Sequence, residues 1–514
     1  MPIFYYPVIK QLMKKVVKMN KGENFMRRAG ILMPITSLPS PYGVGTLGQA
    51  ARDFIDFLKK AGQTYWQILP ICPTGYGDSP YQSFSSFAGN PYMIDLDDLA
   101  KEGLLEPSEY KDIKWSEDDS HVDYGILYQN RYNVLKKAVL RVKGEVFDSF
   151  CNEQNEWLED YALYMAIKNY FGGQAFNTWP EDYRLRSPEA LEKMKEECKE
   201  DIHYWKALQF LFFSQWKKLK TYANDAGIQV IGDIPIYVSY DSADVWSNPD
   251  QFQLDESLTP KAIAGCPPDG FAADGQLWGN PLFDWEKMKE EDYSWWIRRI
   301  AYQVKIYDII RIDHFRGFDE YFAIPYGDKT AKNGSWMPGP GISLFKAIEE
   351  KLGKLPIIAE DLGFLTPTVK QLLADTGFPG MKILQFGFDT RDTGDGYLPH
   401  CYPKNCVAYT GTHDNQTVLG WIETAPKEDV EKGIKYLRLT KEEGYHWGMM
   451  RTVWGCVADT SIIPMQDILG LGSEARLNAP STLGNNWTWR CLPGDYNDEL
   501  AKVLYEEMCL YERI

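Results

Sequence analysis

IIRIDHFRGF, residues 309–318, begins as a run of apolar, β-branched residues and ends in an Arg, Asp and His cluster beside a glycine. This pattern is typical of a strand that emerges at the rim of an active site. Strand side chains alternate between two faces, so Arg311 and Asp313 are expected to point the same way. The guanidinium would then favour the ionised form of Asp313. A purely structural salt bridge at a strand end would look the same, so the rest of the chain has to decide between the two interpretations.

Similar short apolar runs recur along the chain between stretches with helical periodicity. They cover residues 30–35, 65–71, 229–236, 309–315, 356–361, 382–388, 406–412 and 461–469. Eight strands that alternate with helices are what a parallel (β/α)8 barrel, the TIM barrel, requires, and we predict this α/β fold. An open, doubly wound sheet is the alternative, but the notable polar residues follow several strands and not one glycine-rich turn.

Two segments are too long for ordinary barrel connections. Residues 96–224 are rich in Glu and Lys with helical periodicity, so we expect an inserted helical subdomain, for which a packing module without chemistry is the plainest interpretation. Residues 241–285 are expected to form a loop insertion carrying Phe271 and Trp278, which is either a lid or a passive surface loop. The barrel as a whole is expected to span residues 29–514, after an N-terminal extension of residues 1–28.

Composition narrows the class of ligand. The 17 Trp and 32 Tyr suit a groove for amphipathic ligands such as sugars, although packing must account for most of them. The net charge of −17 argues against nucleic acid as a partner. The nine cysteines are scattered and lack a CxxC pair, which favours a reducing cytoplasm, and we expect neither a metal nor a cofactor. No apolar run is long enough to predict a membrane span, and the apolar N-terminus precedes its lysines, unlike a secretory signal.

Acidic residues recur where the predicted strands end. Asp233 lies near the end of one run, Glu360 in an acidic pair at the end of another, and Asp414 follows His413 at a third. Alone, each has an ordinary explanation, such as a helix N-cap for the acidic pair. In a barrel, however, strand ends meet at one rim, where catalytic residues lie. Together with Asp313, these acids meet the needs of a retaining glycosidase: a nucleophilic carboxylate, a proton donor and a group that stabilises the transition state.

Seven blocks of sequence carry a resemblance to a known family. They read ILMPITSLPSPYGVGTLG, GDSPYQSFSSFAGNPY, GDIPIYVSYDSADVW, GCPPDGFAADGQLWGNPL, RIDHFRGF, AEDLG and GTHDNQT, in this order. The chain resembles the 4-alpha-glucanotransferases called amylomaltases or disproportionating enzymes, which form glycoside hydrolase family 77 of the alpha-amylase clan. The resemblance implies a barrel without the separate C-terminal β-sandwich of the amylases.

The resemblance also implies a role for each matching residue. Asp313 resembles the nucleophile that forms a β-glucosyl-enzyme, Glu360 the general acid and base, and Asp414 the carboxylate that holds hydroxyls of the distorted sugar ring. The substrate-binding residues expected around them are Arg311, His314, His413, Tyr81 as a platform beneath the sugar, Ser79, Asp233 as a supporting acid, Trp278 and Asn280 in a loop over the acceptor side, Phe271 and Asn478.

The expected reaction is transfer of an α-1,4-glucan segment to the 4-hydroxyl of a second glucan or of glucose by double displacement. The expected substrates are maltooligosaccharides, amylose, starch or glycogen. Phe271 and Trp278 are expected to exclude water from the acceptor site. Two alternatives remain: a plain α-glucan hydrolase on the same barrel, and a catalytically inactive glucan-binding or scaffold protein.

Overall fold

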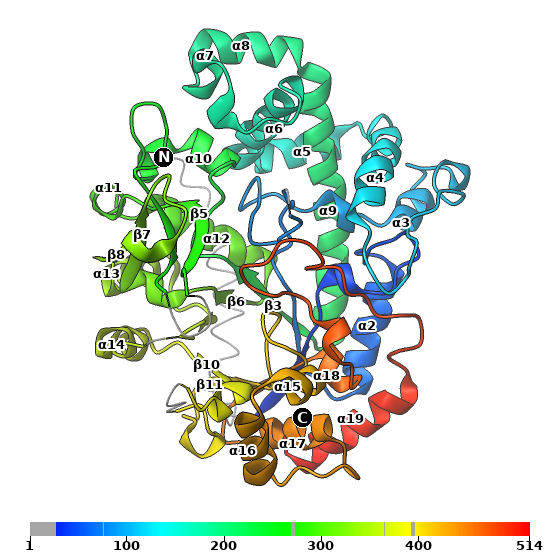
Figure 1. Cartoon of the computed structure of the whole chain (residues 1–514). Coiled ribbons are helices and arrows are strands. Elements are labelled where there is room, and N and C mark those ends of the chain that lie inside the picture. Colours follow the sequence, from blue (N-terminus) through cyan, green and yellow to red (C-terminus); the bar gives the residue numbers. More distant parts are fainter. Residues whose placement is uncertain (1–26, 76, 269–272, 364, 392–395) are drawn as a thin grey trace.

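Eight parallel strands form the centre of the molecule (Figure 1). The computed structural model describes residues 27–75, 77–268, 273–363, 365–391 and 396–514. The strands are β1 (Arg28–Leu32), β2 (Tyr65–Gln67), β3 (Gln229–Ile234), β6 (Ile309–Ile312), β9 (Ile357–Ala359), β10 (Gly380–Ile383), β11 (Cys406–Tyr409) and β12 (Thr460–Pro464). They pair in the order β10-β11-β12-β1-β2-β3-β6-β9. The N–H of Ala359 donates to the carbonyl of Pro379 at 3.0 Å, which joins the two ends of the sheet. The predicted (β/α)8 barrel is confirmed.

Several strands are shorter than the apolar runs that predicted them. In the run 382–388 the strand ends at Ile383 and a 3-10 helix, Leu384–Phe388, follows. In the run 461–469 the strand ends at Pro464 and α18 (Met465–Ile468) begins. Leu384, Phe388 and Met465 are all fully buried although none of them is in a strand. Apolar character reports burial and not backbone conformation, so it could not locate these ends.

Helices surround the barrel and bury one face each, as α2 does with Phe54, Ile55 and Leu58. Along the chain they are α2 (Gln49–Lys60), α12 (Ser294–Ile306), α13 (Ile342–Leu352), α14 (Pro367–Thr376), α15 (Val418–Thr424), α16 (Lys427–Leu437), α17 (Tyr445–Gly455), α18 and α19 (Asp498–Leu510). No described helix is both long and apolar enough to cross a lipid bilayer.

The chain between β2 and β3 is helical. Its helices are α3 (Leu96–Lys101), α4 (Tyr124–Val139), α5 (Glu145–Glu153), α6 (Asn155–Tyr170), α7 (Glu181–Arg184), α8 (Pro188–Glu197) and α9 (Lys199–Asp225). Figure 1 shows them above one side of the barrel, with the long α9 leading back toward β3. Whether residues 96–224 form a separate subdomain stays a prediction.

A second, antiparallel sheet lies in the chain after β3 and was not predicted. Its strands are β4 (Ala262–Cys266), β5 (Gln276–Pro281), β7 (Glu320–Pro325) and β8 (Ser335–Pro338), in the order β5-β4-β7-β8. Residues 241–285, expected to be a loop, therefore contain two strands as well as the helix α10 (Ala243–Ser247), and they end where α11 (Trp285–Glu290) begins. The sequence of β4, AIAGC, has small residues at almost every position, so it gives no period-two signal.

Gly232 in β3 marks a tightly packed position in the barrel. A Cβ atom there would lie 2.1 Å from Cγ of the buried Tyr307 ring. Because overpacking a filled core costs about 1–3 kcal/mol, Gly232→Ala is expected to lower the free energy of unfolding by that amount in a urea titration. Gly455→Ala in α17 is the control, since its Cβ would come no closer than 3.5 Å to Tyr511. Equal unfolding midpoints for the two variants would contradict this packing argument.

Candidate active site

The C-terminal ends of the barrel strands bring the predicted polar residues together. Asp233 lies in β3 and Arg311 in β6, while Asp313 directly follows β6. Glu360 directly follows β9, and His413 and Asp414 lie a few residues after β11. Because parallel strands end at the same rim, residues far apart in the chain become neighbours there.

Arg311 is the charged centre of this rim. Its Nη1 lies 2.7 Å from both carboxylate oxygens of Asp233, and its Nη2 lies 3.0 Å from Oδ1 of Asp313. The register of β3 and β6 sets Asp233 directly beside Arg311. The side chains of Arg311 and Asp233 are 3% and 0% exposed, whereas that of Asp313 is 28% exposed. The guanidinium is thus buried between a structural acid and an acid that faces solvent.

The pKa of Asp313 is set by groups that act on it in opposite directions. Burial raises the pKa of Asp313 to about 7, the Arg311 guanidinium lowers it, and the nearby Glu360 carboxylate raises it. For Arg311 itself burial lowers the pKa, but Asp233 and Asp313 outweigh burial and hold that pKa well above its ordinary value. Arg311 therefore limits the rise in pKa, so that a fraction of Asp313 is ionised near neutral pH.

A chain of polar contacts continues from Asp233 around the rim. The hydroxyl of Tyr81 donates to Oδ2 of Asp233 at 2.8 Å and lies 2.9 Å from Nε2 of His413. The same Nε2 lies 3.3 Å from Oδ2 of Asp414, and Nδ2 of Asn478 donates to Oδ1 of Asp414 at 2.6 Å. The rings of Tyr81 and His413 stack with centroids 5.3 Å apart. The chain therefore links four strand ends through hydrogen bonds and one stacked pair.

Asp414 and His413 behave as an ion pair. Burial acts to raise the pKa of Asp414, but His413 and Asn478 outweigh it and hold this pKa at about 2. Burial acts to lower the pKa of His413, but the Asp414 carboxylate raises it above its usual value. The two shifts agree in sign, so both partners favour the charged pair.

Glu360 is fixed by backbone groups. Its Oε2 accepts the N–H of His314 and its Oε1 accepts the N–H of Leu362, both at 2.7 Å. His314 has φ of +52° and ψ of +50°, a left-handed conformation that is uncommon for a non-glycine residue and that turns its N–H toward Glu360. Burial, and to a lesser degree Arg316, lowers the pKa of the His314 imidazole to about 3, so this ring is neutral. It can donate or accept a hydrogen bond without adding charge.

The small sheet supplies one wall of the site. The ring of Trp278 in β5 meets the ring of His314 edge to face, with centroids 4.8 Å apart. Asn280 is buried, and its Nδ2 donates to the carbonyl of Val238 at 2.8 Å. Ser79 lies in the loop that carries Tyr81, where its hydroxyl accepts the N–H of Tyr81 at 3.3 Å. Phe271, the other predicted lid residue, lies outside the described residues.

Two residues that contact the predicted set were missed. Nη2 of Arg476 donates to the carbonyl of Asp414 at 2.8 Å, and its Nε donates to the carbonyl of Asn478 at 2.7 Å. The ring of Trp487 lies 5.8 Å from that of Tyr81 and 5.9 Å from that of His413. Both residues follow β12, beyond the last recognisable sequence block. Only the general excess of Trp in the composition hinted at Trp487.

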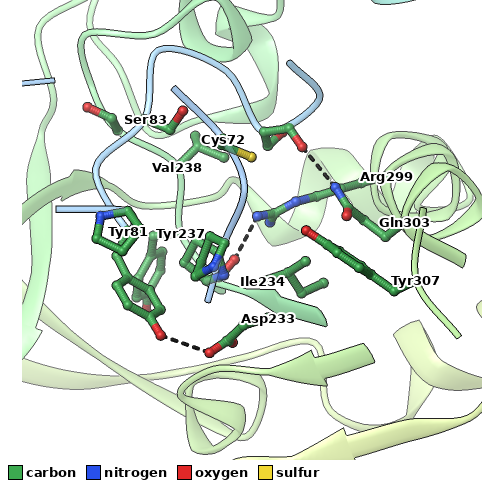
Figure 2. Close-up of a pocket in the computed structure, with 15 residues that line it drawn as sticks. Cys72, Tyr81, Ser83, Asp233, Ile234, Tyr237, Val238, Arg299, Gln303 and Tyr307 are labelled. Atoms are coloured by element: carbon green, nitrogen blue, oxygen red, sulfur yellow. Dashed lines mark hydrogen bonds between the residues drawn. The ribbon is translucent and has the colours of Figure 1, made fainter. Parts of the chain in front are cut away.

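A small pocket lies against Tyr81 and Asp233 (Figure 2). Figure 2 shows Tyr81 and Asp233 joined by their hydrogen bond on one side, with Cys72, Arg299 and Tyr307 around the rest. Most lining atoms are apolar, and neither Asp313 nor Glu360 lines the pocket. It borders Tyr81 and Asp233 and is distinct from the surface that carries the catalytic candidates Asp313 and Glu360.

Comparisons with known proteins agree with one another. A family model described as 4-alpha-glucanotransferase, glycoside hydrolase family 77, matches residues 33–494. A 4-alpha-glucanotransferase of Clostridium butyricum is 53% identical over 486 residues, which are 94% of this chain and 100% of that relative. The structure of an amylomaltase from Streptococcus agalactiae in complex with acarbose matches with a TM-score of 0.92 at 45% identity and covers 95% of this chain and 99% of that one. An amylomaltase from Corynebacterium glutamicum, at 19% identity and a TM-score of 0.76 over 99% of this chain and 77% of that one, shares the fold.

Proposed function

This chain belongs to the 4-alpha-glucanotransferase family, glycoside hydrolase family 77, and from that premise we propose that it moves α-1,4-glucan segments from a donor chain to the 4-hydroxyl of an acceptor glucan or glucose. Its substrates are maltooligosaccharides, amylose, starch or glycogen. The observation that carries the proposal is the contact of 3.0 Å between Arg311 and Asp313, which sets a cation against the proposed nucleophile at a rim where Glu360 and Asp414 also lie.

The first half of the proposed reaction forms a covalent intermediate. A carboxylate oxygen of Asp313 attacks the anomeric carbon, the glycosidic C–O bond breaks, and Glu360 gives its proton to the departing oxygen. Both Glu360 oxygens accept backbone N–H groups, and a protonated carboxyl group keeps lone pairs for these bonds while its O–H donates to the glycosidic oxygen. Asp414, held between His413 and Asn478, is placed to accept hydrogen bonds from hydroxyls of the reacting sugar.

The second half regenerates the enzyme. The 4-hydroxyl of an acceptor attacks the anomeric carbon, its proton passes to Glu360, and Asp313 leaves as a carboxylate. Two displacements give net retention. The neutral His314 imidazole can hydrogen-bond a sugar hydroxyl without adding charge. Trp278, in contact with His314, supports a sugar on the acceptor side.

We also propose that the protein works in the cytoplasm. None of the nine cysteines forms a disulfide in the structure, and several are buried as small apolar groups, for example Cys406 and Cys491. Nine cysteines outside disulfides suit a reducing compartment.

The product pattern from maltotriose separates transfer from hydrolysis. Transfer moves maltosyl or glucosyl units between molecules, so we expect glucose together with a ladder of chains longer than maltotriose, resolved by chromatography. A plain hydrolase would release glucose and maltose and make no longer chain. Absence of the ladder at high maltotriose concentration would contradict the proposed function.

Removal of the nucleophile tests the proposed mechanism. Asp313→Asn keeps the shape of the side chain but cannot form the glucosyl-enzyme, so kcat for disproportionation should fall by at least about a thousandfold. Asp498→Asn is the control, because the Asp498 side chain is 84% exposed at the start of α19 and pairs with Lys60 at the surface. If Asp313→Asn retained its activity, a binding or scaffold function would become the better interpretation.

The acidic limb of the pH profile tests the role of Arg311. Arg311 lowers the pKa of Asp313 against the effect of burial, and the nucleophile reacts in its ionised form. In Arg311→Met the pKa of Asp313 should rise, so the limb on which kcat/KM falls with decreasing pH should move to higher pH. Arg311→Lys keeps a cation, and its limb should stay closer to that of the unmodified enzyme. A limb at the same pH in all three proteins would contradict this electrostatic role.

A further inference from the structure

The backbone at Trp278 and Asn280 lacks regular pairing with its neighbouring strand. In the β4–β5 ladder, Gly265 pairs with Leu277 and Ile263 pairs with Pro281, so the register shifts across the intervening residues. Gly279, in the middle of this irregularity, has φ of +77°. Such a bulge aims side chains in directions that a regular strand would not allow, but it leaves local polar groups without ladder partners. Contacts from segments other than β4 are therefore needed to fix Trp278 and Asn280, which form the proposed acceptor side of the site.

Gln82 supplies the missing contacts. Its Nε2 donates to the carbonyl of Trp278 and to Oδ1 of Asn280, both at 3.1 Å. Gln82 directly follows Tyr81, and its own backbone is fixed by the bond from its N–H to the carbonyl of Ser79 at 3.2 Å and by the N–H of Gly75, which donates to its carbonyl at 3.2 Å. One carboxamide therefore ties the loop that carries the sugar platform to the strand that carries Trp278.

The opposite side of Asn280 is fixed as well. Its Nδ2 donates to the carbonyl of Val238, in the segment that follows β3. With Nδ2 engaged in this way, Oδ1 faces Gln82 as an acceptor. Three segments, after β2, after β3 and in β5, thus meet at one pair of amide side chains. This junction therefore links Trp278 to the loop of Tyr81 directly, in addition to the contacts that each ring makes at the barrel rim.

We propose that Gln82 is a positioning residue for the acceptor side, and that it sets how often the glucosyl-enzyme is resolved by a sugar and how often by water. This inference rests on the proposed function. Water is always present at the groove, so transfer wins only when an acceptor is bound close to the anomeric carbon in the correct orientation. A wall that can shift by a fraction of an ångström binds the acceptor less well and admits water, whereas the donor side, built on the barrel rim, stays in place.

The test replaces the carboxamide and measures the fate of the intermediate. Gln82→Glu keeps the shape but loses the amide donor and sets a carboxylate against two acceptor oxygens. We expect the ratio of transfer to hydrolysis, measured from maltotriose as longer chains against new reducing ends, to fall roughly fivefold to tenfold, the effect of losing about one hydrogen bond. The KM for glucose as acceptor should rise by a similar factor, and the KM for the donor should change by less than about twofold. Gln82→Asn removes the same contacts without adding charge and serves if the charged variant does not fold.

Gln253→Met is a matched control. The Nε2 of Gln253 also donates to one backbone carbonyl, that of Phe283 at 2.9 Å, and to one side-chain oxygen, the hydroxyl of Tyr321 at 3.0 Å. It should lose a comparable amount of stability while leaving the transfer ratio unchanged. An unchanged ratio in a folded Gln82 variant, or an equal fall in Gln253→Met, would overturn the inference. Failure of the unmodified enzyme to form longer chains would instead overturn the proposed function, so the two failures are distinguishable.

Discussion

The guanidinium of Arg311 is the interaction on which the rest of the site depends. It is shared between Asp233, with which it is fully buried, and Asp313, which remains accessible. Removing one partner of a buried ion pair typically costs about 3–5 kcal/mol, because the other charge is left unpaired. The register of β3 against β6 creates this contact, and the same contact sets the charge of the proposed nucleophile. The same side chain therefore serves both the packing of the barrel and the proposed reaction. For this reason residues 309–318 alone do not distinguish a structural salt bridge from an active site.

The hydrogen bonds that run from this centre explain why the site needs a closed barrel. Tyr81 connects Asp233 to His413, and His413 connects to Asp414. These residues come from the ends of β2, β3 and β11, and each is held by a different stretch of backbone. An open sheet would leave β11 far from β3, and Tyr81 could not reach both partners. The bond from Ala359 to Pro379, which joins the sheet ends, is thus part of what orders the catalytic rim.

The sequence predicts those features of the fold and the site that follow from strand periodicity and local charge. Eight buried runs predicted the barrel, and the rule that strand ends share a rim placed Arg311, Asp313, Glu360 and Asp414 near one another. Sequence reasoning fails where conformation is set by distant contacts. The strand β4 carries small residues and no alternation, so the sequence predicts a loop where β4 and β5 form part of the antiparallel sheet. Arg476 and Trp487 reach the site from loops after β12, and Gln82 acts through a carboxamide whose partners lie almost 200 positions later in the chain. No local pattern marks such contacts.

The proposed acid and base adds a constraint of its own. Glu360 has both oxygens on backbone N–H groups, and one of these belongs to His314 in its left-handed conformation. That conformation costs energy for a non-glycine residue, so the contact to Glu360 offsets part of the strain. A protonated Glu360 keeps lone pairs for both N–H groups while its O–H can point toward a glycosidic oxygen. The two backbone bonds therefore fix the orientation of the carboxyl group, and with it the direction from which the proposed acid would donate its proton. His314 joins this fixed group to Trp278 through the contact between their rings.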